Sequence, residues 1–426
     1  MKKQTILFIL GLGLSLHSFS QGLIRLSPEE RATYPEMDAQ VMGYAKDFPA
    51  RHDMLAYAPP VQFQEGGTCV GFAAGYCAHS TMLNKSMGLT HPNHKYVVCM
   101  DPYFIYSFIN SNYSDPCDEG LTFPDLFKVF ENVGNMRDMY PPVLNCSFSW
   151  TGSNGEILNE NFEYFQASLP FRISDWGFLN LEEGDWKETM RTFLANDVPV
   201  IVGADIDNNF DNETRGGKIQ DNGVYYATPE ENGEKGGHAM CVLGYDDYKA
   251  GGSFLVRNSW GGQWGDGGNV WIRYSDFREI VYAAAVIIPE NWYENQTKSD
   301  DYNITFKETE VEGVEYGVIS ANGVIYEGFY AKDRRVLGYE IFEDGGVYFG
   351  QYTNLVKDGV GIFFDEDSER YKCEFKSGEV VDMVKGFASS AEERTFEESY
   401  LQSILDASGD WSEFEGELPS IDYIKE

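Results

Sequence analysis

Three side chains of this sequence are of the types that carry out nucleophilic acyl transfer. Cys69 follows the glycine-containing stretch Glu65-Gly-Gly-Thr68, His238 follows Gly236-Gly237, and Asn258 comes after a strand-like run. A thiolate can attack an acyl carbon, an imidazole can move the proton, and a side-chain amide can hold the imidazole in orientation. The cysteine and the histidine are 238 − 69 = 169 residues apart, so only a folded domain can bring them together.

The residues after Cys69 predict a helix that begins near the cysteine. They lack proline and place Phe72, Tyr76 and Met82 at roughly helical intervals, while Gly66-Gly67-Thr68 before them is typical of a tight loop. A thiol at a helix N-terminus lies near unpaired N–H groups and the positive end of the helix dipole, and both favour the thiolate. We therefore expect a lowered pKa for Cys69. The alternative role for a single cysteine is that of a small buried hydrophobic residue.

His238 is one of six histidines and the only one in the second half of the chain. The apolar run after it is typical of a buried strand, so a structural histidine at a strand edge is the alternative role. Asn258, which follows the strand-like run Ser253-Phe-Leu-Val-Arg257, favours the catalytic role because a third group is required to orient the imidazole.

The stretches around these residues resemble the papain-like cysteine peptidases, of the bacterial type. The string Asn258-Ser-Trp260-Gly-Gly-Gln-Trp264-Gly is the most specific part of the resemblance, which covers roughly residues 49–289. The resemblance implies a two-lobed α+β fold, with the nucleophile in a helical half and the base in a β half. It also implies that the Cys69 thiolate attacks a peptide carbonyl and that the His238 imidazolium protonates the leaving amine.

The resemblance implies roles for four further residues. Trp260 would shield the hydrogen bond of the catalytic imidazole from water, and Gln64 would donate its side-chain amide to the oxyanion together with the N–H of Cys69. Gly120 and Gly237 would line the substrate cleft. Gln64 stands five residues before Cys69, where many members have six, and an exposed loop residue without a role is the alternative for it.

The N-terminus predicts export. Met1-Lys2-Lys3, the apolar run from Ile6 to Leu14 and Ser18-Phe-Ser20 are typical of a signal peptide, and the run is too short to anchor the chain in a bilayer. Family members are usually held inactive by a long helical propeptide, and about 28 residues before Pro49 are too few for that arrangement. We therefore expect a periplasmic or extracellular protein that is active at once on export or controlled by another segment.

Composition narrows the expected partners. The chain has 32 Lys and Arg against 68 Asp and Glu, a formal charge of −36. This negative charge repels nucleic acid and the anionic lipid headgroups of a membrane, and it therefore argues against both as partners. No ligand spacing supports a metal site, and no cofactor is expected. Seven cysteines occur, and Cys99 with Cys117 is the expected disulfide because the two flank one short segment, although connectivity does not follow from sequence.

The C-terminal third of the chain repeats. Tyr326-Glu-Gly328, Tyr348-Phe-Gly350 and Tyr371-Lys-Cys373 recur at spacings of 22 and 23 residues, which is typical of a stacked array. The units resemble MORN repeats. Such an array is either a structural appendage without a ligand, a docking surface for a protein or a glycan, or a lid for the peptidase cleft.

These observations predict an α+β papain-like fold with a small all-β repeat appendage and a C-terminal helix. We divide the chain into a signal peptide at 1–20, a short N-terminal segment at 21–48, a papain-like domain at 49–289, a linker at 290–312, a MORN-like repeat region at 313–386 and an acidic tail with one helix at 387–426.

The predicted function is an exported cysteine endopeptidase that hydrolyses proteins or peptides through an acyl-enzyme. One alternative is a catalytically inactive papain-fold binding protein that acts through its repeats. A second alternative keeps the thiol chemistry but acts on a non-peptide amide.

Overall fold

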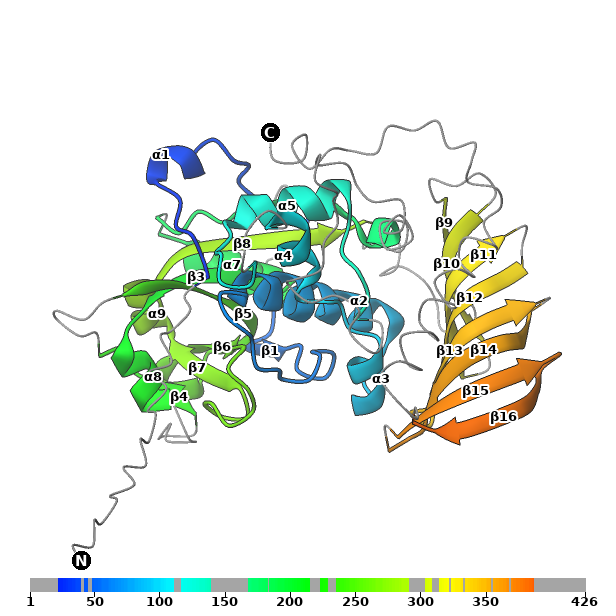
Figure 1. Cartoon of the computed structure of the whole chain (residues 1–426). Helices are drawn as coiled ribbons and strands as arrows, with labels where there is room; N and C mark the ends of the chain where they lie inside the picture. The colour runs from blue at the N-terminus through cyan, green and yellow to red at the C-terminus, as the bar shows by residue number, and fades with distance from the viewer. Residues whose placement is uncertain are drawn as a thin grey trace, which may run out of the picture.

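The computed structural model of the chain contains two β-sheets, and helices pack on the first of them (Figure 1). The second sheet lies to one side, beyond helices α2 and α3. The structure describes residues 22–39, 42–44, 48–110, 116–138, 168–182, 184–214, 223–228, 235–290, 303–308, 314–321, 323–331, 334–353, 355–367 and 369–386.

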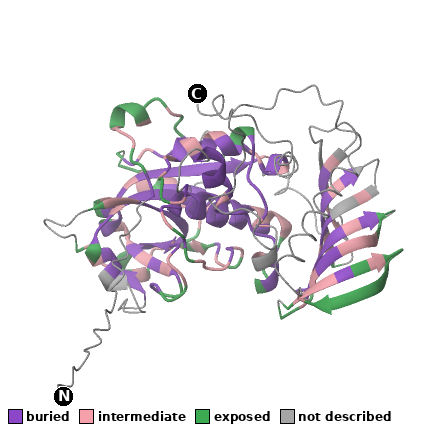
Figure 2. Ribbon diagram, in the orientation of Figure 1, coloured by how far each residue is buried: buried purple, intermediate pink, exposed green. Residues whose placement is uncertain are grey.

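The first sheet lies at the centre of the larger unit and has the strand order β2-β8-β3-β5-β6-β7-β4, with β1 paired to β5. The central strands β5 and β8 are almost wholly buried (purple in Figure 2), which explains why their sequences are continuous apolar runs rather than alternating ones. The strands are β1 (Arg51–Asp53), β2 (Ile173–Phe178), β3 (Val200–Ile206), β4 (Val224–Tyr225), β5 (Gly236–Asp246), β6 (Ser253–Arg257), β7 (Asn269–Arg273) and β8 (Val281–Pro289).

A buried helix packs against β5 and carries the predicted nucleophile at its start. It begins at Cys69, continues as the π-helix η1 and passes directly into α2, and every residue of η1 is buried. The helix predicted after Cys69 is therefore present. The helices are α1 (Pro28–Arg31), η1 (Gly71–His79), α2 (Ser80–Met87), α3 (Pro92–Val97), α4 (Phe104–Ile109), α5 (Phe123–Asn132), η3 (Leu169–Phe171), α7 (Trp186–Ala195), α8 (Asn208–Thr214), η4 (Lys249–Gly251) and α9 (Tyr274–Ile280).

The start of α5 fixes the loop that carries Gly120. The hydroxyl of Thr122 accepts a hydrogen bond from the N–H of Asp125, and the Asp125 carboxylate accepts one from the N–H of Thr122, with Pro124 in the first turn. This reciprocal capping satisfies N–H groups that the helix itself leaves unpaired. Residues 120–121 are thereby held at a defined place beside the helix.

The second sheet is an antiparallel meander in which each strand pairs with its sequence neighbours. The sequence predicted a linker at 290–312, but its strand β9 lies within that range and pairs with β10. The domain boundary is thus earlier than predicted. The strands are β9 (Asn303–Glu308), β10 (Val314–Ala321), β11 (Val324–Ala331), β12 (Arg334–Phe342), β13 (Val347–Thr353), β14 (Val356–Phe364), β15 (Arg370–Lys376) and β16 (Glu379–Lys385).

The repeated tyrosines and glycines of this sheet pack in one recurring arrangement. Gly350 and Gly361 face each other on β13 and β14, and a Cβ at either position would lie within 2.6 Å of the Tyr348 ring. The missing side chains therefore let the ring lie flat on the strands. In the third unit Cys373 faces Met383 instead of a glycine pair, and the apolar residues of the outer strand β16 are exposed: Val380, Val381, Met383 and Val384.

Two side chains of helix α3 contact backbone carbonyls of the second sheet, near the turn between β12 and β13. The Asn93 side-chain N–H donates to the Gly345 carbonyl at 2.6 Å, and Nε2 of His94 lies 2.8 Å from the Phe342 carbonyl. The sheet is therefore attached to the helical side of the first unit, as Figure 1 shows.

A buried ion pair joins the sheet to the same side. Arg137 pairs with Glu327 of β11, and the two side chains are only 4% and 2% exposed. The Tyr316 hydroxyl also donates to Glu327, at 2.6 Å, and Arg137 donates to the Val98 carbonyl. A charge pair this deeply buried is tolerated only when both partners are in place.

Several predictions concern residues outside those that the structure describes: the signal peptide at 1–20 and the tail with its helix at 387–426. The predicted disulfide is wrong, because Cys99 is a buried thiol that is not disulfide-bonded, whereas Cys117 is disulfide-bonded. Among the helices described, none is long and apolar enough to cross a membrane. The described part of the chain holds no cluster of metal-ligating side chains.

Candidate active site

Cys69 lies at the start of the buried helix, and its side chain is 0% exposed. Tyr106 of α4, also fully buried, holds the backbone on both sides of it. The Tyr106 hydroxyl accepts from the N–H of Val70 at 3.2 Å and donates to the Gly67 carbonyl at 3.0 Å. The position of the sulfur is therefore set by a side chain from another helix.

His238 and Asn258 meet beside this cysteine. The imidazole lies on β5, and its Nε2 is 2.7 Å from Oδ1 of Asn258, which follows β6. The next residue on β5, Ala239, donates its N–H to Sγ of Cys69 at 3.4 Å. The fold thus brings the three predicted residues together, although no hydrogen bond joins the described side chains of Cys69 and His238.

An indole covers the imidazole. The rings of Trp260 and His238 have centroids 4.8 Å apart, and Trp264 and Phe210 pack edge-on against Trp260. This aromatic layer keeps water from the contact between His238 and Asn258, because those groups are buried beneath it. It corresponds to the position that the sequence indicated for Trp260.

Burial opposes the charges that acyl transfer needs. It raises the pKa of Cys69 to about 11, although N–H groups of Ala239 and Gly22 favour the thiolate. Burial lowers the pKa of His238 to about 4, although the hydrogen bond that the imidazole donates to Oδ1 of Asn258 raises it. The lowered cysteine pKa expected from the helix N-terminus is therefore wrong for this state, because desolvation outweighs the helix terms.

Gln64 is buried beside Cys69 and is tightly held. Its Nε2 donates to the Gly66 carbonyl at 2.9 Å, its Oε1 accepts from the Ser259 hydroxyl at 2.6 Å, and its backbone N–H donates to the Ser259 carbonyl. The alternative of an exposed loop residue is thereby excluded. Sequence reasoning did not identify Ser259 as the residue that holds this side chain.

The chain's own N-terminal segment, residues 22–39, runs over the sulfur. The N–H of Leu23 donates to the Gly237 carbonyl at 3.2 Å, and Gly22 and Ile24 each bond to the backbone of Leu121. A Cβ at Gly22 would lie 1.5 Å from the Gly67 carbonyl oxygen, so only glycine fits there. The segment explains why Cys69 is inaccessible.

The two predicted cleft residues both contact this segment. A Cβ at Gly237 would meet the Leu23 carbonyl oxygen at 2.3 Å, and one at Gly120 would meet the Gly22 carbonyl oxygen at 2.8 Å. The absence of side chains at these positions lets an extended peptide approach the strand β5 on one side and the 120–121 loop on the other.

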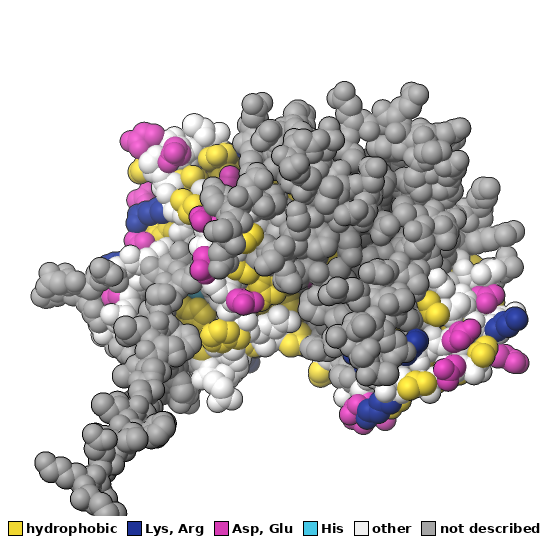
Figure 3. Space-filling view, in the orientation of Figure 1, with side chains coloured by type: hydrophobic (Ala, Val, Ile, Leu, Met, Phe, Trp, Pro, Cys, Tyr) yellow, Lys and Arg dark blue, Asp and Glu magenta, His cyan; other side chains and the backbone are white. Residues whose placement is uncertain are grey.

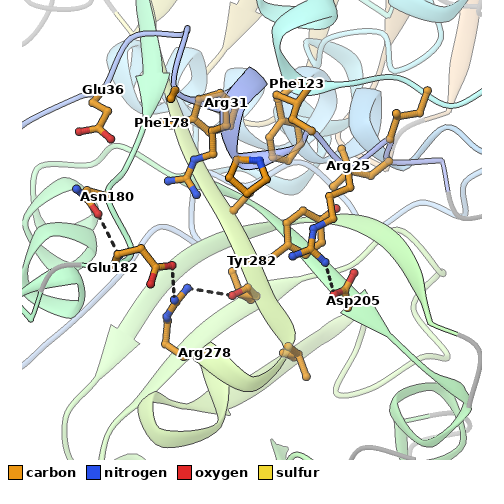
Figure 4. A pocket seen from close by; sticks show the side chains of 18 of the residues that line it. Arg25, Arg31, Glu36, Phe123, Phe178, Asn180, Glu182, Asp205, Arg278 and Tyr282 are labelled. Atoms are coloured by element: carbon orange, nitrogen blue, oxygen red, sulfur yellow. Dashed lines mark hydrogen bonds and ion pairs between the residues drawn. The ribbon is translucent and has the colours of Figure 1, made fainter. Parts of the chain in front are cut away.

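Beyond Leu23 a cavity of about 690 Å³ lies between the segment and strand β8 (Figure 4). Arg25 points to Asp205 there, with Nη1 2.7 Å from Oδ2, and its guanidinium lies 4.2 Å from the centre of the Tyr282 ring. The sequence carried no local signal for this contact, because the partners lie on β3, β8 and the segment.

The family comparison agrees with this geometry. Residues 168–288 match the model of the papain family of cysteine proteases. Over these residues the chain is therefore similar to the papain family of cysteine proteases. His238 and Asn258 lie within the matched residues, and Cys69 lies before them.

Related proteins match a similar share of the chain. A cathepsin L-like protein of Caenorhabditis elegans is 26% identical over 155 residues, which are 30% of this chain and 44% of that protein. Cathepsin L of Sarcophaga peregrina is 27% identical over 172 residues, 34% of this chain and 48% of that protein. The chain therefore spans less than half of the length of these relatives.

Solved structures also match part of the chain. Xylellain, a cysteine protease from Xylella fastidiosa, has a TM-score of 0.43 and 18% identity, and the match covers 63% of this chain and 96% of that one. Digestive procathepsin L2 from the larval midgut of Tenebrio molitor has a TM-score of 0.46 and 20% identity, with 63% and 78% covered.

Proposed function

We propose that this protein is a cysteine endopeptidase in which Cys69 is the nucleophile, His238 the general acid and base, and Asn258 the residue that orients the imidazole. The observation that carries the proposal is the hydrogen bond of 2.7 Å between His238 and Asn258, on a strand whose next N–H donates to Cys69. Nucleophile, base and orienting amide in this order are what acyl transfer by a thiol requires.

The reaction has two steps. The Cys69 thiolate attacks the scissile carbonyl, and the imidazolium of His238 gives its proton to the leaving amine. A water molecule, deprotonated by His238, then releases the acyl group and restores the thiol. Gln64 is a candidate donor to the oxyanion with the Cys69 N–H, and breaking its bond to Gly66 would free its amide for that role.

The described state is proposed to be latent. Residues 22–24 occupy the backbone positions that an extended peptide would take, and they leave Cys69 0% exposed. The sequence suggested that the region before Pro49 was too short for a long helical propeptide, but a few extended residues suffice to fill a cleft. Activity then requires that the segment leave, by cleavage or by displacement.

Export to the periplasm or the extracellular space, and a MORN-like nature of the second sheet, remain parts of this proposal. The sheet is a poor candidate for a lid, because it packs on the helical side and none of its described residues lines the cavity beside Tyr282. A protein or glycan ligand fits its outer edge better than a nucleic acid or a membrane: acidic, basic and apolar side chains are interspersed on the part of that edge visible in Figure 3.

The inactive binding protein is the second candidate, and the neutral, covered Cys69 favours it. Covalent capture separates the two. We would treat reduced full-length protein with an epoxysuccinyl peptide and measure the intact mass of the wild type, Cys69→Ala and Gly22→Val. Gly184→Val is the matched control, because a Cβ there meets open space.

Gly22→Val should give a single adduct that depends on Cys69, and it should form faster than in the wild type or in Gly184→Val. Leu23→Glu, which places a carboxylate in an apolar site, should act in the same way. If folded Gly22→Val and Leu23→Glu both stay unlabelled, the peptidase proposal is wrong and the binding function takes its place. Equal labelling of the wild type and Gly22→Val would overturn latency alone. Turnover of simple amides without turnover of peptides would instead favour the non-peptide substrate.

A further inference from the structure

The N-terminal segment places an arginine in a site that its departure would empty. We propose that Tyr282 and Asp205 form a subsite for an arginine or lysine side chain of the substrate, on the acyl side of the scissile bond. This inference rests on the proposed peptidase function and names the class of peptide that the site would select.

Arg25 makes two contacts that are typical of guanidinium recognition. Its Nη1 lies 2.7 Å from Oδ2 of Asp205, and its Cζ lies 4.2 Å above the centre of the Tyr282 ring. Figure 4 shows the guanidinium between the two side chains. A charged hydrogen bond and a cation–π contact together select a planar cation over a neutral side chain of the same size.

The partners of Arg25 belong to the sheet that stays behind. Asp205 lies near the end of β3 and Tyr282 lies at the start of β8, and these two strands are hydrogen-bonded neighbours. The ring of Tyr282 also closes the space over Gly203, where a Cβ would lie 3.2 Å from it. The subsite is therefore built from paired strands and does not depend on the segment for its shape.

Loss of the segment would leave this cavity acidic. Of the charged residues that line it, Arg25, Arg31 and Glu36 belong to the segment itself. The remaining charged residues are three carboxylates and one guanidinium, and that guanidinium, Arg278, is already paired with Glu182 at 3.0 Å. The four residues are Glu182, Asp205, Arg278 and Glu279. A cationic side chain would restore the balance that Arg25 now provides.

Besides the Asp205 carboxylate, the subsite contains a second polar group, the hydroxyl of Tyr282. This hydroxyl has no hydrogen-bond partner among the described residues. It points toward Gly237, where a Cβ would lie 3.1 Å from the oxygen, and thus toward the cleft. The apolar side chain of Leu23 beside it cannot form a hydrogen bond with this oxygen, whereas a guanidinium or ammonium group can donate to it.

The distance along the segment places the subsite. Gly22 lies at the sulfur of Cys69, and Arg25 is three residues away along an extended chain. With the residue at the sulfur counted as the first before the scissile bond, Arg25 corresponds to the fourth. The proposal therefore concerns the second, third and fourth substrate positions before that bond.

The test compares peptides that differ at one residue. Full-length Gly22→Val would be assayed on fluorogenic tetrapeptide amides that carry Arg, Gln or Glu at the second, the third or the fourth position before the scissile bond. At one of these positions, kcat/KM for Arg should exceed that for Gln by about tenfold, since a charge-assisted hydrogen bond is replaced by a neutral one. The Glu peptide should be the poorest substrate.

Variants then assign the preference to the subsite. In the Gly22→Val background, Asp205→Asn should bring the Arg-to-Gln ratio close to one, and Asp205→Lys should invert the preference toward Glu. Tyr282→Leu should lower the ratio by about threefold, because the cation–π contact is lost. Glu188→Gln is the matched control: it removes a carboxylate that is 49% exposed, contacts Arg191 and does not line the cavity, so it should leave the ratio unchanged.

The outcomes distinguish this inference from the proposed function. Cys69-dependent turnover of all peptides without a preference for Arg overturns the subsite alone. A loss of preference in Glu188→Gln as large as in Asp205→Asn also overturns it, because the selection would then come from the overall acidity. No Cys69-dependent turnover of any peptide contradicts the peptidase function itself.

Discussion

At the scale of single residues, one cause sets the state of the candidate site. Burial raises the pKa of the Cys69 thiol and lowers the pKa of the His238 imidazole, so both groups are neutral near pH 7. A neutral pair is a poor nucleophile and a poor acid. The same two residues would exchange a proton once water or substrate replaced the backbone of Gly22 above them.

Tyr106 is a positioning residue, because its hydroxyl bonds to the backbone on both sides of the nucleophile. Tyr106→Phe would leave the Val70 N–H and the Gly67 carbonyl without their partner. In the Gly22→Val protein we expect kcat to fall by about tenfold with little change in KM, because the sulfur would be less well placed. The free energy of unfolding should fall by about 1–2 kcal/mol.

Tyr76→Phe is the control for this experiment. Tyr76 lies on η1, the helix that follows Cys69, and is also buried, but its hydroxyl donates to the Pro60 carbonyl at 2.7 Å. It should lose stability to a similar degree and keep its kcat. An equal fall of kcat in both variants would show that Tyr106 has a merely structural role.

Much of the candidate site could be predicted from the sequence, and the prediction of the Cys69 pKa failed for a physical reason. Cys69, His238 and Asn258 stand out because their types and neighbouring glycines and tryptophan are unusual, and the fold does bring them together. The direction of the Cys69 pKa shift does not follow, because it depends on Gly22, which is 47 residues away along the chain (69 − 22). Local patterns report helix ends but not what covers them.

At the scale of elements, the N-terminal segment decides whether the thiol can react. The binding of the segment over Cys69 depends on Gly22, which has no room for a Cβ, and on the ion pair of Arg25 with Asp205. Neither contact requires a helical propeptide. The segment is also anchored further along, where the N–H of Met37 donates to the Phe178 carbonyl at 2.8 Å, so its first residues can leave while the rest stays bound.

The pH dependence of alkylation tests this control. A raised thiol pKa means that the reactive thiolate is scarce below it, so the rate of iodoacetamide reaction at wild-type Cys69 should rise about tenfold per pH unit toward a pKa of about 11. In Gly22→Val the sulfur is hydrated and still near the helix N–H groups, so its rate should level off at lower pH. Peptide mapping after a timed reaction at each pH between about 6 and 10 would give both curves.

Gly184→Val should reproduce the wild-type curve, because a Cβ there meets nothing within 4 Å. Superimposable curves for all three proteins would contradict the control by the segment. A wild-type curve that already levels off near neutral pH would show that the sulfur is a thiolate in the resting protein.

The strands and helices follow the sequence unevenly. The buried strands β5 and β6 around the site are apolar runs with clear ends, and the repeated Tyr and Gly residues predict the meander of the second sheet. The strand β9 lies where the sequence suggested a linker, because a polar edge strand is stabilised by pairing with β10 rather than by its own pattern. Pairing partners are a property of the fold and not of the segment.

At the scale of the whole molecule, the second sheet packs against the unit that is built on the first sheet. Aromatic residues from both sides pack together, as in the edge-on contact of Phe171 with Tyr316 at 5.3 Å. The contact lies on the helical side, away from the cavity beside Tyr282. The repeats can therefore stabilise the helical half while their outer edge stays free for a partner.

The buried pair Arg137–Glu327 can be used to test how much the contact between the two units contributes to the free energy of unfolding. Glu327→Gln keeps the shape of the side chain but leaves the guanidinium of Arg137 buried without its counter-ion, and each side chain is less than 5% exposed. The free energy of unfolding should fall by about 3–5 kcal/mol. The measurement is urea unfolding followed by tryptophan fluorescence and by far-UV circular dichroism, and the wild type should show one transition by both probes.

Glu369→Gln, which removes a surface pair with Lys385 in the same sheet, should cost less than about 1 kcal/mol. An unchanged midpoint for Glu327→Gln, or separate transitions by the two probes in the wild type, would mean that the sheet folds independently and that its contact with the helical half contributes little to stability.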